Sequence, residues 1–248
     1  MLMAMTNSKD MDLAFMVWIF QKSSVVECLT NKQRSTSYFL NYLEEIQGVP
    51  RCIRVDEGTE NGYMINMQKS LRWHHEDDRC GEKSVIIGSS PSNQRIERWW
   101  RSLREMGIVF WIDMFKDMDD EGVFSTANPV HIECLRFCFM QIIQGELDEI
   151  RTEWNQHKIR TQGIEGSPDG KPDMLFCHPE LFGTAEYKYP VNVADIQALK
   201  SFCDEQSTTG CTEAMHHRFI SLLHEGGRQQ PETCQDAVKL LTWLIPQL

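Results

Sequence analysis

Two acidic residues stand at positions where a carboxylate can take part in metal chemistry. Asp56 follows the strand-length run Cys52–Val55, so its side chain is expected at the end of a strand. Glu97 is expected in the first turns of a helix that follows the loop Gly88–Pro91. Two carboxylates brought together can hold Mg²⁺ or Mn²⁺, and such ions activate a water or hydroxyl in phosphoryl transfer. The plainer alternative is that Asp56 caps a turn and Glu97 pairs with Arg101.

Arginines recur every three residues around Glu97 and therefore follow one stripe of the expected helix. They are Arg95, Arg98, Arg101 and Arg104. Such a stripe can contact the phosphate backbone of DNA, because guanidinium groups bind phosphate oxygens. The alternative is a solvated helix face whose positive charges balance Glu97 and Glu105.

The 248-residue chain carries a net charge of −11 that is unevenly distributed. Residues 119–248 hold 10 Lys and Arg against 20 Asp and Glu, so this half contributes −10 of the −11. An acidic protein gains little non-specific attraction to phosphate backbones. Any DNA contact is therefore expected at a local patch in the first half, and the acidic second half favours a protein partner.

Composition and cysteine spacing exclude several classes of protein. No apolar run reaches the ~20 residues that a membrane helix needs, so we expect no membrane partner. The nine cysteines form no CxxC pair, which favours free thiols in a reducing, intracellular compartment. Cys134 and Cys138 are expected on a buried helix face rather than at a metal. His74, His75 and Cys80 are expected in a mobile, charged surface loop, with a metal site as the alternative.

Strand and helix patterns alternate in the first part of the chain and only helices follow. Strands are expected at 15–20, 24–28, 52–55 and 85–87. Helices are expected at 35–47, 63–73, 95–115 and 129–157, and then at 192–206, 212–224 and 232–245. This order predicts an α/β domain at 14–160, preceded by a disordered leader at 1–13. A linker and an all-helical C-terminal extension are expected at 161–248.

Two sequence motifs resemble those of a known protein family and add to this interpretation. The phrase V-D-E-G-T-E-N at 55–61 and the phrase S-P-S-N-Q-R-I-E-R-W-W at 90–100 resemble those that carry the second and third catalytic carboxylates of the retroviral-type integrase core. Two later phrases, D-D-E-G at 119–122 and N-Q-H-K-I-R-T at 155–161, make the chain most similar to the integrase-core-like proteins of animal genomes, which are related to transposons. The resemblance covers roughly residues 24–180.

The resemblance implies a ribonuclease-H-like mixed sheet flanked by helices. It also implies that Asp56 and Glu97 are catalytic and bind Mg²⁺ or Mn²⁺ for DNA integration by two-metal phosphoryl transfer. A nuclear location follows from the resemblance alone. Because the helix after the catalytic glutamate lies near the dimer contact in the viral cores, we also expect a homodimer through the helix that contains Trp99–Phe115.

The chain departs from the family at the first of its three catalytic carboxylates. The family places this aspartate in a D-G-[FY]-S-R phrase on the first strand, whereas residues 16–24 here read M-V-W-I-F-Q-K-S-S. The nearest carboxylates, Asp10 and Asp12, lie outside the expected strand. Loss of one metal-binding carboxylate should impair two-metal catalysis. The alternative function is that of a non-catalytic, integrase-derived module that binds DNA or a protein.

Overall fold

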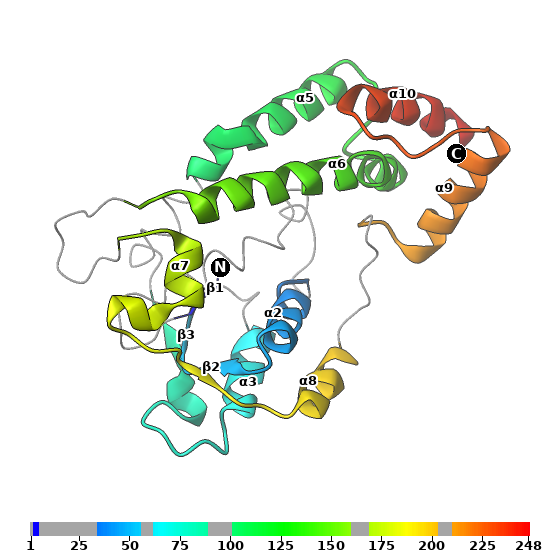
Figure 1. Cartoon of the computed structure of the whole chain (residues 1–248). Helices are drawn as coiled ribbons and strands as arrows, with labels where there is room; N and C mark the ends of the chain where they lie inside the picture. The colour runs from blue at the N-terminus through cyan, green and yellow to red at the C-terminus, as the bar shows by residue number, and fades with distance from the viewer. Residues whose placement is uncertain (1, 5–33, 56–61, 89–100, 160–168, 203–209) are drawn as a thin grey trace. The chain divides into compact units, whose positions relative to one another are not determined.

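The computed structural model describes residues 2–4, 34–55, 62–88, 101–159, 169–202 and 210–248 (Figure 1). The chain forms two compact units. Among the described residues, the first unit holds the chain up to residue 88 together with 151–202, and the second holds 101–150 and 210–248. Within this described part of the chain, no helix is both long and apolar enough to cross a lipid bilayer.

A small mixed sheet organises the first unit. Strand β3 (Ile53–Val55) is central, with β1 (Leu2–Ala4) antiparallel on one side and β4 (Val85–Ile87) parallel on the other. Ile53 and Val55 are fully buried, as expected for β-branched side chains on a central strand. A second pair, β2 (Val49–Pro50) with β5 (Lys188–Tyr189), is antiparallel.

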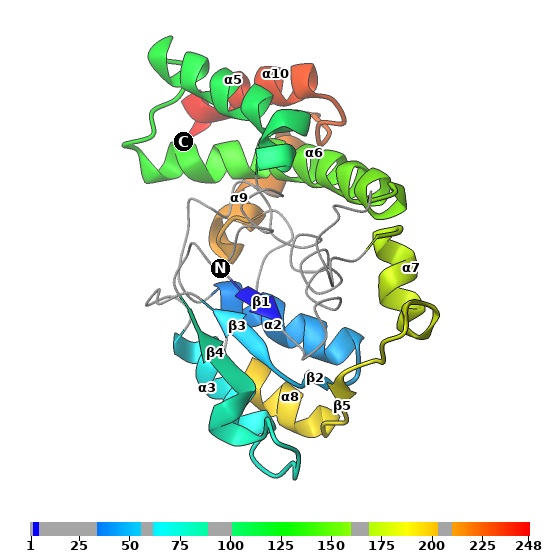
Figure 2. The same ribbon diagram turned by 90° about the vertical axis from the view of Figure 1, so that its left-hand side faces the viewer.

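Helices cover this sheet and supply most of its core (Figure 2). The helices of the first unit are α2 at Arg34–Glu45, α3 at Gly62–Leu71, α7 at Pro172–Cys177 and α8 at Val193–Lys200, with 3-10 helices at Gly81–Ser84 and Pro179–Phe182; α2, α3 and α8 contribute to the core of the sheet. Phe39, Leu40 and Leu43 come from one face of α2 and pack with Ile53 and Ile196. Burial of this apolar stripe is the main force that holds the unit together.

Every secondary-structure element described in the second unit is a helix. A π-helical turn at Arg104–Ile108 leads into α5 (Val109–Asp120), and the long helix α6 (Pro129–Gln156) follows, with its residues up to 150 in this unit. Helices α9 (Glu213–Glu225) and α10 (Cys234–Leu244) complete it, with a final 3-10 turn at Ile245–Gln247. The aromatic pairs Trp111–Phe139 and Phe137–Phe219 join α5 to α6 and α6 to α9.

The sequence predicted most of these elements, but the structure differs from the prediction near the N-terminus and in the C-terminal region. The expected strands at 52–55 and 85–87 and the expected helices at 35–47, 63–73 and 129–157 match β3, β4, α2, α3 and α6 closely. The strands expected at 15–20 and 24–28 lie outside the described residues. Leu2–Ala4 forms β1 inside the leader that we expected to be disordered. The region 161–248 divides between the units, since β5 and α8 belong to the first, whereas α9 and α10 belong to the second.

Candidate functional site

The ends of β3 and β4 meet at one edge of the sheet, where the sequence predicts a carboxylate pair. The strands are parallel and in register, with Val55 opposite Ile87. The Gly88 N–H donates to the Val55 carbonyl oxygen at 3.0 Å and ties the two strand ends together. Asp56 is the next residue after β3, and both Asp56 and Glu97 lie outside the described residues. Their roles therefore stay predictions, resting on a strand end that the sequence located correctly.

The arginine stripe is described for two of its four members. Arg101 and Arg104 are exposed near the start of the helix that leads into α5, whereas Leu103 between them is buried. Arg95 and Arg98 lie outside the described residues. Exposure of Arg101 and Arg104 fits both a phosphate-binding face and a solvated face, so the two interpretations remain.

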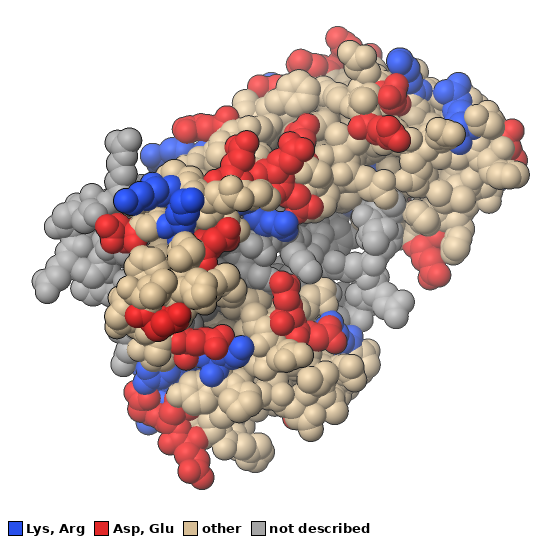
Figure 3. Space-filling model, in the orientation of Figure 1, with Lys and Arg blue, Asp and Glu red and all other residues tan. Residues whose placement is uncertain are grey.

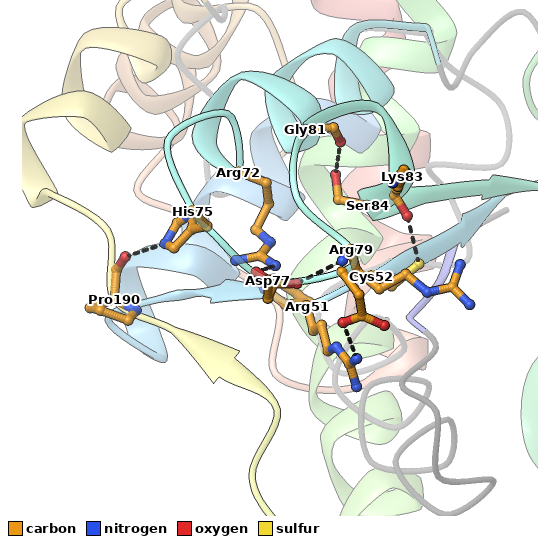
Figure 4. Close-up of polar contacts among 12 residues, drawn as sticks. Arg51, Cys52, Arg72, His75, Asp77, Arg79, Gly81, Lys83, Ser84 and Pro190 are labelled. Atoms are coloured by element: carbon orange, nitrogen blue, oxygen red, sulfur yellow. Dashed lines mark hydrogen bonds and ion pairs between the residues drawn. The ribbon is translucent and has the colours of Figure 1, made fainter.

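A network of ion pairs stabilises the loop between α3 and β4 (Figure 4). One of its arginines, Arg51, lies just before β3, the strand that ends directly before Asp56. The Arg72 guanidinium is fully buried and pairs with Asp77, whose side chain is 15% exposed. Arg51, between β2 and β3, pairs with Asp78, whose side chain is 63% exposed. The Gly81 N–H donates to the Arg72 carbonyl oxygen at 3.1 Å and closes the loop. The loop predicted to be mobile is therefore anchored to the core by buried charge.

The two aspartates of this network are held in their charged form. Burial would raise the pKa of Asp77, but hydrogen bonds from the Arg79 backbone N–H and the Arg72 guanidinium outweigh it and hold this pKa below its ordinary value. The hydrogen bond from Arg51 is the main cause that lowers the pKa of Asp78, and it also raises the pKa of Arg51. These carboxylates serve the fold as charge partners.

Comparison with models of known protein families identifies the family of this chain. The model of the integrase core domain matches residues 19–179, which is more than half of the chain. The chain belongs to the integrase core domain family. No curated protein and no solved structure matches it. The match confirms the resemblance seen in the sequence, and it ends just before β5 and α8.

The His, Cys, Asp and Glu side chains that the structure of this integrase core describes form no metal site. Within the described ranges, no group of three His, Cys, Asp or Glu side chains is placed to hold a metal ion. His75 instead contacts the chain beside β5, where its Nε2–H donates to the Pro190 carbonyl oxygen at 3.1 Å. Cys134 and Cys138 are buried on α6 as expected, and burial raises the pKa of both thiols, that of Cys134 to about 12.

Helix α5 of the integrase core and the π-helical turn before it expose an apolar stripe. Met106, Val109, Phe110 and Ile112 are each more than 40% exposed. The opposite face of α5 is buried through Trp111, whose indole N–H donates to Glu146 at 2.6 Å. This exposed stripe lies within the helix that the sequence predicted as a dimer contact.

Sequence reasoning missed the contacts that β5 makes with β2 and with Arg72, the residue after α3. Arg72 stands over the Tyr189 ring, with its guanidinium carbon 3.9 Å from the ring centroid. The available signal was the alternation of Tyr187, Lys188 and Tyr189, which is typical of a strand, but a two-residue strand gives too little pattern to detect.

Proposed function

We propose that this protein is an integrase-derived DNA-binding protein with a ribonuclease-H-like core and impaired strand-transfer chemistry. Membership of the integrase core domain family carries the proposal. The mixed sheet supports it, because β3 has an antiparallel neighbour and a parallel neighbour and ends directly before Asp56. Catalytic chemistry in α/β proteins is commonly placed at such strand ends.

In this proposal Asp56 and Glu97 hold a divalent cation. Their carboxylates are the hard oxygen donors that Mg²⁺ and Mn²⁺ prefer, and a bound ion would supply charge stabilisation for a phosphoryl group. The family's first catalytic aspartate has no counterpart in the sequence at 16–24, and Asp10 and Asp12 lie outside the phrase that carries it. Two carboxylates in place of three support ion binding but make full strand transfer inefficient.

The DNA contact proposed here uses the arginine stripe. Arg101 and Arg104 are exposed, and in the sequence they come directly after the family phrase that contains Glu97. Each phosphate that a guanidinium neutralises releases counterions, so affinity falls steeply with salt. A gel-shift titration of a DNA duplex at several salt concentrations tests this contact. Replacing both arginines by alanine should reduce the slope of log affinity against log salt by about 2.

Lys116→Ala provides the matched control, because Lys116 is exposed further along α5 and outside the stripe. Its slope should change by less than that of the double arginine variant. DNA binding that is unaffected by loss of Arg101 and Arg104 would contradict the proposed contact.

A nicking assay separates impaired catalysis from its absence. Supercoiled plasmid is incubated with the protein and Mn²⁺, and the comparison is with Glu97→Gln. Slow nicking that Glu97→Gln abolishes would support a weakened integrase site. If the wild type nicks the plasmid no faster than Glu97→Gln does, the second candidate function is favoured. This candidate is a non-catalytic module that binds DNA or a protein.

Surface charge favours a protein as the partner in that second candidate. Glu146, Glu149 and Glu153 are exposed along one face of α6, and Figure 3 shows acidic side chains over this helix. A DNA duplex would be repelled there, whereas a basic protein surface would be attracted. Binding of a basic protein that persists in the arginine variants would identify this mode.

A homodimer through the apolar stripe of α5 completes the proposal. Phe110 is 55% exposed at the centre of a stripe that also contains Val109 and Ile112. Large exposed apolar side chains grouped on one helix are typical of interfaces. Phe110→Glu should convert a dimer to a monomer in light scattering after size exclusion, while Lys116→Glu should not. A wild-type protein that is monomeric at high concentration would contradict the dimer.

A further inference from the structure

The chain just beyond the family match forms a segment that pairs outside the main sheet. Residues 184–200 comprise β5, a short connection at 190–192 and α8, and we call them the strap. Among the described strands, β5 pairs only with β2, in a two-stranded sheet separate from β1, β3 and β4 (Figure 2). The strap can therefore leave its place without breaking a hydrogen bond between strands of the three-stranded sheet.

A few side chains attach the strap to the rest of the first unit. Residues 184–200 are all described, and Ile196 is the one among them that is fully buried, against the apolar cluster that includes α2. Val191 and Leu199 are partly buried against the same cluster, and Lys200 pairs with Glu44 on α2. A segment with so few buried side chains opens at a lower free energy than a central strand does.

The strap also covers polar atoms that are left without hydrogen-bond partners. Arg72 is fully buried, and its guanidinium carbon lies 3.9 Å from the centroid of the Tyr189 ring. Its Nε and Nη1 atoms have no partner among the described residues, and the same holds for His75 Nδ1. His75 contacts the strap through its Nε2–H, which donates to the Pro190 carbonyl oxygen at 3.1 Å (Figure 4). Because desolvated polar atoms carry a cost that water removes, opening of the strap relieves this cost.

The rest of the first unit keeps its own contacts when the strap leaves. All but two of the buried side chains in its core cluster come from α2, α3 and β3. Gln68 on α3 is buried, and its Nε2 donates to the Pro50 carbonyl oxygen at 2.7 Å, so β2 stays tied to α3 without β5. Arg72 likewise keeps its ion pair with Asp77.

Gly48 lies at the closest approach of the strap to the start of β2. A Cβ atom at this position would lie 2.8 Å from the Tyr189 carbonyl oxygen and would collide with the Lys188 side chain. Glycine therefore allows β5 to close onto β2. A larger residue at this position would push β5 away while the anchors on α2 and α8 stay unchanged.

We infer that the strap is a conformational device, which opens as one piece while the three-stranded sheet stays folded. Ile196 and the ion pair between Lys200 and Glu44 hold it closed. The desolvated nitrogen atoms of Arg72 and His75 favour its release. Opening uncovers the apolar face of α2 that Ile196 covers and the side of Arg72 that faces Tyr189. The strap therefore controls access to a surface that is hidden when it is closed.

Hydrogen exchange of the full chain, resolved by residue, tests this device. The Arg51 N–H donates to the Tyr187 carbonyl oxygen at 2.9 Å and so reports on the strap from outside it. In the wild type the Arg51 amide and the hydrogen-bonded amides of α8 should exchange at similar rates, about tenfold or more faster than those of 53–55. If the protected amides of α8 and of 53–55 exchange at one common rate, the inference is overturned.

Ile196→Ala removes the buried anchor and should speed exchange of Arg51 and α8 by about tenfold or more, with 53–55 changed by less than about twofold. Val193→Ala is the matched control on the same helix and should change neither rate, because Val193 is 41% exposed. Acceleration at 53–55 equal to that in α8 would show that the strap is an integral part of the sheet and would contradict the inference.

Gly48→Ala is a second variant that leaves Ile196 in place, so it decides the question if Ile196→Ala does not fold. It should speed exchange of Arg51 and α8 and leave the protection of 53–55 unchanged. Unchanged exchange of Arg51 and α8 in a folded Gly48→Ala protein would refute the closure of β5 onto β2, and equal loss of protection at 53–55 would refute independent opening.

Discussion

Two neighbouring aspartates provide a sensitive test of the polar network, because each pairs with an arginine but only one pair is buried. Asp77 pairs with fully buried Arg72, whereas Asp78 pairs with Arg51 and is 63% exposed. Asp77→Ala leaves a buried guanidinium without its carboxylate. Removing one partner of a buried pair costs about 3–5 kcal/mol. The Tyr189 ring offsets part of this cost through a cation–π contact.

We therefore expect Asp77→Ala to lower the free energy of unfolding by about 3 kcal/mol, which is roughly a 150-fold change in the unfolding equilibrium. The melting temperature should fall by about 6–12 °C. Urea denaturation followed by circular dichroism measures the first quantity and calorimetry the second. Asp78→Ala is the matched control and should cost far less, because exposed ion pairs contribute little.

The pH dependence of stability follows from the same pair. Because the folded state lowers the pKa of Asp77, its stabilising contribution is present above the ordinary carboxyl pKa of about 4 and is lost as the pH falls below it. Between pH 5 and 3 the wild type should lose stability more steeply than Asp77→Ala. Equal losses in Asp77→Ala and Asp78→Ala, or parallel acid profiles, would refute the buried-charge argument.

Three further predictions concern a buried side chain, the reactivity of two thiols and a helix cap. Phe219→Ala should cost about 3–5 kcal/mol in urea denaturation, because Phe219 is fully buried against α6, while exposed Ile220→Ala should cost little. In the native protein Cys177 should react with iodoacetamide well before Cys134, since Cys177 is exposed and burial raises the pKa of Cys134 to about 12; mass spectrometry identifies the modified thiol. Thr233→Ala should cost about 1 kcal/mol in the same denaturation assay, because the Thr233 hydroxyl accepts from the Asp236 N–H and caps α10.

Each of these predictions has a clear contrary result. Equal destabilisation by Phe219→Ala and Ile220→Ala would mean that the α6–α9 contact is absent in solution. Early modification of Cys134 would show that α6 opens readily. Thr233→Ser keeps the hydroxyl and should restore stability; failure to do so would exclude capping as the cause of the loss.

The sequence located the elements whose pattern is local and strong. Apolar spacing in Phe39, Leu40 and Leu43 marks α2, and the β-branched runs at 53–55 and 85–87 mark the parallel strands that lead to the predicted site. Such local patterns can be recognised without knowing which segments pair in the fold, because each pattern follows from the burial of one helix face or of a short strand.

Long-range pairing was beyond the reach of sequence patterns. Strand β2 contains only Val49 and Pro50, and proline argues against a strand, so its pairing with β5 leaves no local signal. Arg72 falls at the end of the helix expected at 63–73, where nothing in the sequence indicates that an arginine is buried, yet tertiary contacts with Asp77 and Tyr189 bury it completely. The division of the C-terminal region between two units likewise depends on which apolar faces meet.

A manganese titration by calorimetry tests the central proposal most directly. The wild-type chain is compared with Asp56→Asn and Glu97→Gln, and circular dichroism verifies that all three are folded. We predict a single binding event in the wild type that is lost in both variants. An identical binding curve in all three proteins, or no binding by a folded wild type, would contradict a retained ion site in this integrase core.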